Sequence, residues 1–418
     1  MIEPKIAIVG SGPSGCFAAQ FLRKSLPDAE ITIFETLPVP YGLARFGVAA
    51  DHQGSKSVCA QFDRMFERDG VQFAGNVTVG DDISFSDLRS LFDIVIVASG
   101  LRNDRRLELQ KDKDMNIVGA GEIVRALNGF PEIDLPKDTS GNLAPLGQKL
   151  AVVGNGNVAI DVIRMLTRPI RGFDGSDVDD ARLLALRGNG IRSIDVLGRS
   201  PIEHAKFDTS MLREISHLPN VKMSCTGTEG STDCKALDIF REHSGASEPD
   251  VEIRFHFKRV PSAFLKNGDT SILFTEAPDG AEHFEVDTLV TAIGFFDGLP
   301  SGHPRSGHSW VGPNVFRVGW AENGGQGTIA ANRKSSKTVA QDIVDALTNG
   351  KLQIGAAGYH GARHRIQSDI ISFDGWKRID EAERANRAEG RLRNKITDTS
   401  EMIKIALGQV QSSLTKCA

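Results

Sequence analysis

Three glycines near the start of the chain have the spacing of a turn that binds a diphosphate. Gly10, Gly12 and Gly15 form a G-x-G-x-x-G motif. An apolar run at 5–10 precedes the motif as a buried strand would, and residues 16–26 follow with helical spacing. Glycines let the backbone approach phosphate groups, and the N-terminus of a helix offers them free N–H groups and a favourable dipole. The segment therefore predicts a strand–turn–helix unit that binds a dinucleotide.

An acidic residue stands where such a unit would hold the ribose of its ligand. Glu35 ends the next apolar run, 31–35, and lies 25 residues after Gly10. A carboxylate at this place can accept hydrogen bonds from both ribose hydroxyls of an adenosine that lacks a 2′-phosphate. The first site therefore suits FAD or NAD, and its N-terminal position favours FAD. The alternative interpretation is that the glycines only form a tight turn.

A second glycine motif occurs in the middle of the chain. The apolar run 149–154 leads into Gly154 and Gly156. Ala159 replaces the third glycine, a change that the motif tolerates, and a helical pattern follows at 160–168. Two such units in one chain predict two nucleotide-binding domains.

The two sites differ in the charge that follows the second strand. In the second unit the run 193–198 is followed by Arg199 rather than by an acid. A guanidinium can pair with a 2′-phosphate, which a carboxylate would repel. The second site is therefore predicted to bind NADP(H). The alternative is a surface arginine at a loop tip, because Ser200 adds no second charge.

Further apolar runs supply the remaining strands that would position these turns. Strands are predicted at 93–100, 287–294 and 314–320, and a helix at 335–347. The stretch 225–285 is irregular and predicts mostly short strands and turns. Strands that alternate with helices in this way predict an α/β fold with parallel sheets.

Composition excludes several classes of protein. The 418 residues carry 49 Lys+Arg against 54 Asp+Glu, and a net charge of −5 argues against a nucleic-acid partner. No apolar run reaches the roughly 18 residues of a membrane span, so a cytoplasmic location is the default expectation. The five cysteines are scattered without a CxxC motif. No metal site and no cysteine-ligated iron–sulfur cluster is therefore expected in this chain.

Several segments, in this order and spacing, resemble the adrenodoxin reductase family of NADPH–ferredoxin reductases. They are ETLPVPYGLARFGVAADH at 35–52, GNGNVAIDV at 154–162, LGRSP at 197–201 and VGW at 318–320. The proline-rich segment with GLxRxGVxxDH is the most specific of them. The two glycine motifs alone would also fit glutamate synthase small subunits and flavin monooxygenases.

The resemblance implies two Rossmann-type dinucleotide-binding domains, with the NADP domain inserted into a discontinuous FAD domain. The FAD domain would comprise residues 1–105 and 295–418, the latter with a C-terminal extension. The NADP domain would comprise residues 106–294. The cofactors would be FAD and NADP(H).

The resemblance also implies binding residues at matching positions. Those for FAD, besides the glycines of the first motif, are Ser14, Glu35, Gly42, Leu43, Val79, Trp320, Gly327, Thr328 and Ile329. Those for NADP(H), besides Gly154, are Asn155, Gly156, Asn157, Val158, Arg199, Ser200 and Gly327.

The chemistry that the resemblance implies is hydride transfer from NADPH to FAD, followed by transfer of single electrons to a ferredoxin-type iron–sulfur protein. His52 and Glu214 match residues that the family places near the flavin and the nicotinamide. For each of them the alternative is a purely structural role, as a structural or surface histidine and as a charge on a helix surface.

Departures from the family pattern leave other functions open. One is a turn at 323–327 that lacks the usual basic residue. Ser200 replaces the second arginine of a pair, and Met211 replaces a glutamate that contacts the dinucleotide. The segment that carries basic residues for docking ferredoxin is shortened. Four cations remain as docking candidates, or as solvated charges: Arg241, Arg254, Lys258 and Arg259.

The alternative functions are an NAD(P)H-dependent flavin oxidase or monooxygenase with a small acceptor, and a non-catalytic flavin-binding subunit. The first predicts rapid reoxidation of the flavin by air. The second requires a decayed nicotinamide site, and the intact GNGNVA turn argues against it.

Overall fold

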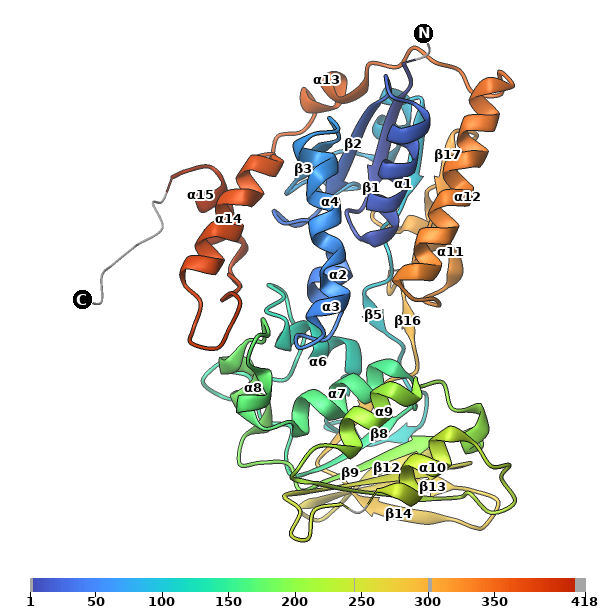
Figure 1. Cartoon of the computed structure of the whole chain (residues 1–418), viewed down its shortest axis with the longest axis vertical. Helices are drawn as coiled ribbons and strands as arrows, with labels where there is room; N and C mark the ends of the chain where they lie inside the picture. The colour runs from blue at the N-terminus through green and yellow to red at the C-terminus, as the bar shows by residue number, and fades with distance from the viewer. Residues whose placement is uncertain (1–2, 244, 300–302, 410–418) are drawn as a thin grey trace, which may run out of the picture. The chain divides into compact units, whose positions relative to one another are not determined.

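The computed structural model describes residues 3–243, 245–299 and 303–409. The chain forms two compact units (Figure 1). The first unit comprises Met1–Val48, His52–Arg102 and Phe295–Ala418, and the second comprises Ala49–Asp51 and Asn103–Gly294. The chain therefore changes unit after Val48, Asp51, Arg102 and Gly294.

A parallel sheet with the strand order β17-β4-β1-β2-β3 forms the centre of the first unit (Figure 1). Its strands are β1 (Lys5–Val9), β2 (Glu30–Glu35), β3 (Gln72–Gly75), β4 (Ile94–Val97) and β17 (Val315–Arg317). The apolar runs are buried on both faces, as parallel strands require. The chain adds β2 and β3 on one side of β1 and β4 and β17 on the other, so the order reverses between β1 and β4. Ligands of such sheets bind at this reversal.

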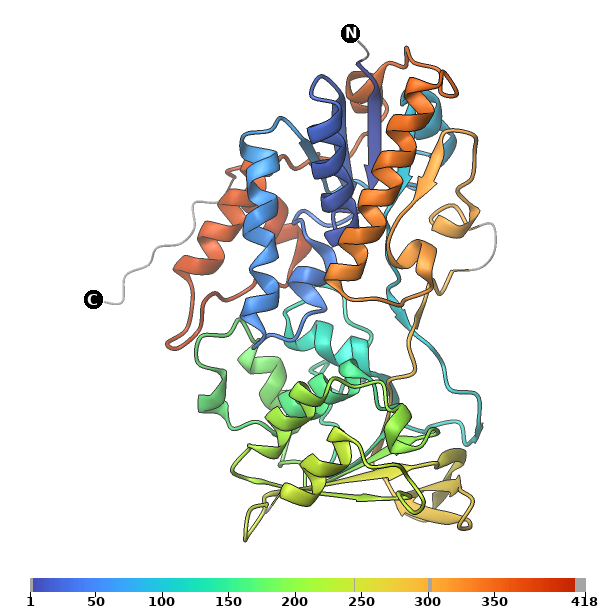
Figure 2. The same ribbon diagram turned by 45° about the vertical axis from the view of Figure 1, so that its right-hand side comes forward.

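Helices α1 and α12 lie side by side in the first unit (Figures 1 and 2). Ser336 Oγ in α12 donates to Ser14 O in α1 at 2.9 Å. The helices of this unit include α1 (Pro13–Ser25), α2 (Gly42–Phe46), α3 (Gln53–Lys56), α4 (Val58–Glu67), α5 (Phe85–Leu91), α11 (Trp320–Asn323), α12 (Ile329–Thr348), α13 (Gly358–Arg363), α14 (Phe373–Ala385) and α15 (Thr399–Ala406).

A buried ion pair ties the C-terminal helices to the N-terminal part of the same unit. Glu383 in α14 is fully buried and pairs with Arg45 in α2. The guanidinium of Arg45 lies 4.8 Å from the centre of the Trp376 ring, and Glu383 also pairs with Arg393 at 3.3 Å. Since breaking a buried pair typically costs about 3–5 kcal/mol, the C-terminal helices are an integral part of the first unit.

A second parallel sheet, with the order β10-β11-β9-β8-β15-β7, forms the centre of the second unit. Its strands are β7 (Ile117–Gly119), β8 (Lys149–Val153), β9 (Ser193–Gly198), β10 (Val221–Thr226), β11 (Val251–Phe257) and β15 (Thr288–Thr291). The helices of this unit include α6 (Ala120–Leu127), α7 (Asn157–Thr167), α8 (Asp180–Arg187), α9 (Thr209–Ser216) and α10 (Lys235–Glu242). The strand order reverses between β8 and β15, as it does between β1 and β4 of the first unit.

A smaller sheet, β14-β13-β12-β6, packs on the second unit. Its strands are β6 (Gln110–Lys111), β12 (Val260–Asn267), β13 (Thr270–Glu276) and β14 (Glu282–Glu285), while β5 (Asn103–Asp104) and β16 (Phe295–Phe296) are two-residue strands where the chain changes unit. Phe264 and Leu273 of this sheet share an apolar cluster with Val153 of β8 and Leu197 of β9.

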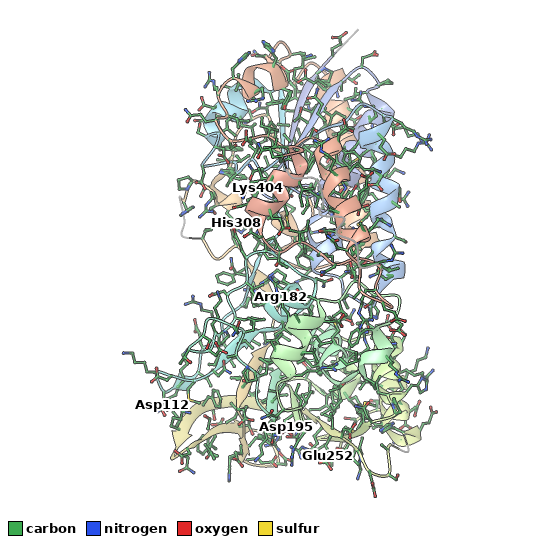
Figure 3. The ribbon with its side chains drawn as sticks, turned by 90° about the vertical axis from the view of Figure 1, so that its left-hand side faces the viewer. Asp112, Arg182, Asp195, Glu252, His308 and Lys404 are labelled. Atoms are coloured by element: carbon green, nitrogen blue, oxygen red, sulfur yellow. The ribbon has the colours of Figure 1, made fainter. Side chains whose placement is uncertain are left out.

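The expectation of mostly short strands and turns at 225–285 was wrong. This stretch contains α10 and the long strands β11, β12 and β13. Two polar residues of β11, Arg254 and His256, both contact the buried Asp195 of β9 (labelled in Figure 3). Burial raises the pKa of Asp195, but hydrogen bonds from Arg254 and His256 outweigh it and hold that pKa below its usual value.

Residues 49–51 belong to the second unit, although the flanking residues belong to the first. Ala49 and Ala50 are fully buried in the core of the second unit, and Ala50 O accepts from Asp177 N at 3.3 Å. The methyl groups of the two alanines fit this part of the core, which a larger side chain would overpack. No helix in the described part of the chain is both long and apolar enough to cross a membrane.

Candidate dinucleotide-binding sites

The first glycine turn lies at the strand-order reversal of the first unit. Gly10 follows β1 with a φ of +107°, and its N–H donates to Phe34 O at 2.8 Å. A Cβ at this position would lie 2.4 Å from Ala98 O, just beyond the end of β4. Both the left-handed backbone and the close approach exclude a side chain, so the sequence motif is enforced by the turn itself.

The backbone beside Gly12 faces open space at the N-terminus of α1. A Cβ on Gly12 would meet no atom within 4 Å, whereas one on Gly42 would lie 3.2 Å from Gly12 Cα. The segment that begins α2 therefore packs closely against the turn and leaves one side of it open. A cradle without side chains at the start of the long helix α1 fits a diphosphate.

Glu35 is fixed at the carboxyl end of β2, beside this cradle. Its Oε2 accepts from Ser11 N at 3.0 Å and from Ser11 Oγ at 2.7 Å, and its Oε1 accepts from Leu37 N at 3.2 Å. The side chain is 7% exposed. These donors hold the carboxylate in one orientation, and Oε1, which accepts only one of these bonds, keeps a lone pair for a ribose hydroxyl.

The second chain segment of the first unit brings more predicted residues to the start of α1. A Cβ on Gly319 would lie 2.1 Å from Ser14 Oγ, so α11 begins in close contact with α1. Trp320 Nε1 donates to Gly327 O at 3.1 Å, and the indole stacks on Phe295 with ring centres 5.2 Å apart. This bond closes the glycine-rich turn before α12.

The start of α12 carries an unpartnered polar atom. Thr328 is the N-cap and its hydroxyl accepts from Ala331 N at 3.4 Å, so Ile329 is the first helical residue. Asn332 Oδ1 is buried and has no hydrogen-bond partner among the described residues. A buried acceptor of this kind costs free energy unless something pairs with it. A polar cofactor such as FAD fits this requirement.

Two further predicted FAD residues occupy different surroundings. Leu43 is a partly buried residue of α2, and its carbonyl accepts from Gly47 N at 2.8 Å and Val48 N at 2.9 Å. Val79 lies in the apolar core of the first unit with Val77 and is only 3% exposed. Of the two side chains, Leu43 therefore offers more surface to a ligand.

The turn in the second unit repeats the geometry of the first. Gly154 also has a φ of +107°, and its N–H donates to Leu197 O at 2.9 Å. A Cβ there would lie 2.4 Å from Ala292 O, just beyond the end of β15, whereas a Cβ on Gly156 would meet no atom within 4 Å. The turn therefore presents an open cradle at the start of α7, and fits a second diphosphate.

Asn155 places an unpartnered donor next to the end of β9. Its buried Nδ2 has no hydrogen-bond partner among the described residues, and a Cβ on Gly198 would lie 2.5 Å from it. Asn157 begins α7 and its Oδ1 accepts from Asp208 N at 2.7 Å, while Val158 packs against the apolar core. The free amide donor fits a ligand that carries acceptor oxygens.

Arg199 and Ser200 follow β9 directly. Arg199 is exposed, and Ser200 is partly buried with its carbonyl accepting from Lys258 N at 3.3 Å. The structure thus brings Asn155, Arg199 and Ser200 together at the carboxyl edge of one sheet, where the sequence placed them.

Glu214 in α9 belongs to a charge network that the sequence did not reveal. Its side chain is 45% exposed, and its Oε2 lies 3.2 Å from Nε of the fully buried Arg164. Arg164 in α7 also pairs with Asp161 and Asp51. Burial opposes its charge, but the carboxylates outweigh burial and raise the pKa of Arg164. Arg164 looks like an ordinary helix-surface cation in the sequence, and only its partners identify it.

His52 lies in the first unit, at the start of α3. Its carbonyl accepts from Ser55 N at 3.1 Å and from Lys56 N at 3.3 Å, so its backbone caps the helix. In the sequence it adjoins Asp51, which belongs to the second unit. His52 therefore lies directly after the point at which the chain passes from the second unit back to the first.

Three of the four cations considered for docking are paired with acids. Arg254 makes two bonds of 2.8 Å to Asp195, and Arg259 lies 3.1 Å from Asp279. Arg241 lies 2.9 Å from Asp233. Lys258 instead donates to a backbone carbonyl, Glu229 O, at 3.0 Å. These residues do not form a strongly basic face. Among the described residues, no group of three His, Cys, Asp or Glu side chains could hold a metal ion.

The chain was compared with known proteins. A family model described as an NAD(P)-binding Rossmann-like domain matches residues 8–60. The chain is 35% identical to a cindoxin reductase from Citrobacter braakii over 99% of its own length and 94% of that protein. It is 29% identical to the mitochondrial NADPH:adrenodoxin oxidoreductase of Drosophila melanogaster over 96% and 93% of the two chains. The chain belongs to the adrenodoxin reductase family.

A solved structure of this family agrees with the fold. FprA from Mycobacterium tuberculosis in complex with NADPH superposes with a TM-score of 0.86 at 28% identity, covering 97% of this chain and all of that one. The predicted fold class, with two Rossmann-type domains, is confirmed. Membership of the adrenodoxin reductase family also confirms FAD and NADP(H) as the cofactors and an oxidoreductase as the class of enzyme.

Proposed function

We propose that this protein is an FAD-dependent NADPH–ferredoxin reductase whose first unit holds FAD and whose second unit holds NADP(H). The observation that carries this assignment is one turn geometry used twice with opposite charges. Gly10 and Gly154 have the same φ and the same close approach, but the strand after the first turn ends at Glu35 and the strand after the second leads to Arg199. The acid suits a free ribose, and the guanidinium suits a ribose with a 2′-phosphate.

When FAD is bound, it accepts a hydride and releases electrons one at a time. The residues of the chain position the cofactor and provide the electrostatic field around it. The turn at Gly10 and the start of α1 receive the diphosphate, and Glu35 accepts from the ribose. The N-terminal N–H groups of α12, from Ile329 onward, offer positive partial charge to the cofactor. Trp320 closes the turn beside them through its bond to Gly327.

His52 and Glu214 are proposed as residues near the reacting rings. The ion pair with Arg164 holds the carboxylate of Glu214, and Asp51 and Asp161 hold Arg164 in turn. This arrangement fixes an acid on α9 without burying it. Hydride transfer itself requires no acid, so His52 is assigned to positioning the flavin and Glu214 to positioning the nicotinamide, rather than to proton transfer.

The acceptor is proposed to be a separate ferredoxin-type iron–sulfur protein. This chain has no cysteine cluster for iron and no CxxC relay, so its electrons leave either to a partner or to oxygen. Anaerobic mixing of the purified protein with NADPH should bleach the flavin, and an added oxidised ferredoxin should restore its colour within the same trace. A flavodoxin serves as a second acceptor. Rapid bleaching without turnover of either carrier, together with vigorous oxygen consumption in air, would favour the oxidase function instead.

Changing Arg199 to alanine is expected to weaken NADPH binding about ten- to a hundredfold and to leave NADH almost unaffected. A charge-assisted contact with a phosphate is worth about 1.5–3 kcal/mol, and NADH lacks that phosphate. Flavin reduction measured against the concentration of each coenzyme tests this. Ser200→Arg should sharpen the preference for NADPH. Equal weakening of both coenzymes by Arg199→Ala would place Arg199 away from the 2′-phosphate.

A further inference from the structure

Lys258 lies beside Arg199 at the carboxyl edge of the second unit's sheet. Strands β9 and β11 are parallel neighbours, and Phe257 pairs with Gly198 at their ends. Backbone contact continues beyond the strand ends although the parallel register does not, because Lys258 N donates to Ser200 O at 3.3 Å and Arg259 N donates to Gly198 O at 3.0 Å. Lys258 and Arg199 therefore each follow directly after one of two paired strand ends, and adjoining strands lie about 4.8 Å apart in a sheet.

The backbone at Lys258 has a conformation that lysine rarely adopts. Its φ is +57°, and only two other non-glycine residues of the described chain, Tyr41 and Asn76, have a positive φ. Glycine would adopt this conformation without strain. Strained residues of this kind gather at ligand sites, where the side chain has a use that offsets the strain.

The charge of Lys258 is not neutralised as those of its neighbours are. Arg254 and Arg259 both pair with carboxylates, whereas Nζ of Lys258 donates to the carbonyl of Glu229. An ammonium group has three N–H donors, so it can keep this bond and still donate to a ligand. The bond ties the ammonium group to the segment that follows β10.

We propose that Lys258 is a second cationic ligand of the 2′-phosphate of NADP(H), opposite Arg199. This inference rests on the proposed function of the second unit. Ser200 supplies no charge, so Arg199 alone would meet a phosphate that carries up to two negative charges. Lys258 follows a different strand, β11, 58 residues further along the chain than Ser200, and restores a pair of cations around one phosphate. It is a determinant of coenzyme specificity.

The test is titration calorimetry of the FAD-containing protein with two nucleotide probes. Adenosine 2′,5′-bisphosphate carries the 2′-phosphate, and adenosine 5′-monophosphate lacks it. Lys258→Met should weaken binding of the bisphosphate about tenfold, the size of one charge-assisted contact, and change that of the monophosphate less than twofold. Lys258→Arg should retain most of the affinity. Lys222→Met, which removes an exposed charge from β10, is the control for net charge and should change neither constant.

A glycine variant separates the charge from the backbone. Lys258→Gly removes the ammonium but suits a φ of +57°, so it should keep the melting temperature and still bind the bisphosphate about tenfold more weakly. Unchanged affinity in Lys258→Gly and Lys258→Met, or equal weakening of both probes, would overturn the proposal. If Arg199→Ala weakens binding of the bisphosphate selectively and the Lys258 variants do not, only the role of Lys258 fails. If the unaltered protein binds the bisphosphate no better than the monophosphate, the assignment of NADP(H) to this unit fails as well.

Discussion

Replacing Gly154 with alanine is expected to give a protein that keeps its FAD but is not reduced by NADPH. The residue has a φ of +107°, and the new methyl group would lie 2.4 Å from Ala292 O. That oxygen belongs to the backbone just beyond β15, so it cannot move away from the methyl group unless the strand moves with it. Left-handed strain alone costs about 1–2 kcal/mol, and the clash adds to it. FAD is assigned to the other unit, which does not contain Gly154.

Gly156→Ala is the matched control for this change. The added methyl group meets no atom within 4 Å, and a φ of −90° suits any residue. The variant should fold and melt like the unaltered protein. The methyl group nevertheless enters the cradle that is assigned to the diphosphate, so the apparent dissociation constant for NADPH should rise at least about tenfold. Calorimetric melting and the rate of flavin bleaching by NADPH measure the two effects separately. Normal NADPH binding by Gly156→Ala would show that the diphosphate does not lie there.

The glycine turns could be predicted from the sequence because their chemistry is local. A strand, a turn with a left-handed glycine and a helix follow one another within about twenty residues, and the side chains that would block the turn are absent from the sequence itself. Glu35 and Arg199 could be placed for the same reason, since each comes at the end of the strand that follows its turn. Helices α1 and α7 begin within three residues of the predicted positions.

The contacts that complete the sites could not be predicted in this way, because they join distant parts of the chain. Lys258 comes close to Ser200 only through the pairing of β11 with β9, which no local pattern specifies. Arg164 is fully buried despite its charge, because Asp51 enters the second unit from a segment more than 100 residues earlier. Asp195 likewise pairs with Arg254 and with the buried His256, two polar residues that gave β11 the composition of a loop. In β11 the contacts with Asp195 therefore concealed a strand that the sequence assigned to short strands and turns.

Replacing Glu35 with glutamine is expected to weaken FAD binding about ten- to a hundredfold. The carboxylate accepts from Ser11 at one oxygen and from Leu37 N at the other. A glutamine has only one acceptor oxygen, so its NH₂ group must face one of these donors. The buried N–H that loses its partner costs about 1–3 kcal/mol, and the ribose loses a charged acceptor as well. Titration of FAD into the apoprotein, followed by flavin fluorescence, gives the affinity directly.

Glu30→Gln is the control because Glu30 lies at the opposite end of the same strand. It pairs with Lys5 at 3.4 Å and accepts from Tyr359 N at 2.5 Å, so the change likewise removes one charge and disturbs a backbone contact in the first unit. FAD affinity should stay within about twofold in this variant, although both variants lose some stability. Equal losses of FAD affinity in the two variants would mean that Glu35 acts through the stability of the sheet alone. A tenfold or greater difference between them would locate the ribose at the carboxyl end of β2, the edge from which Gly10 and the start of α1 receive the diphosphate.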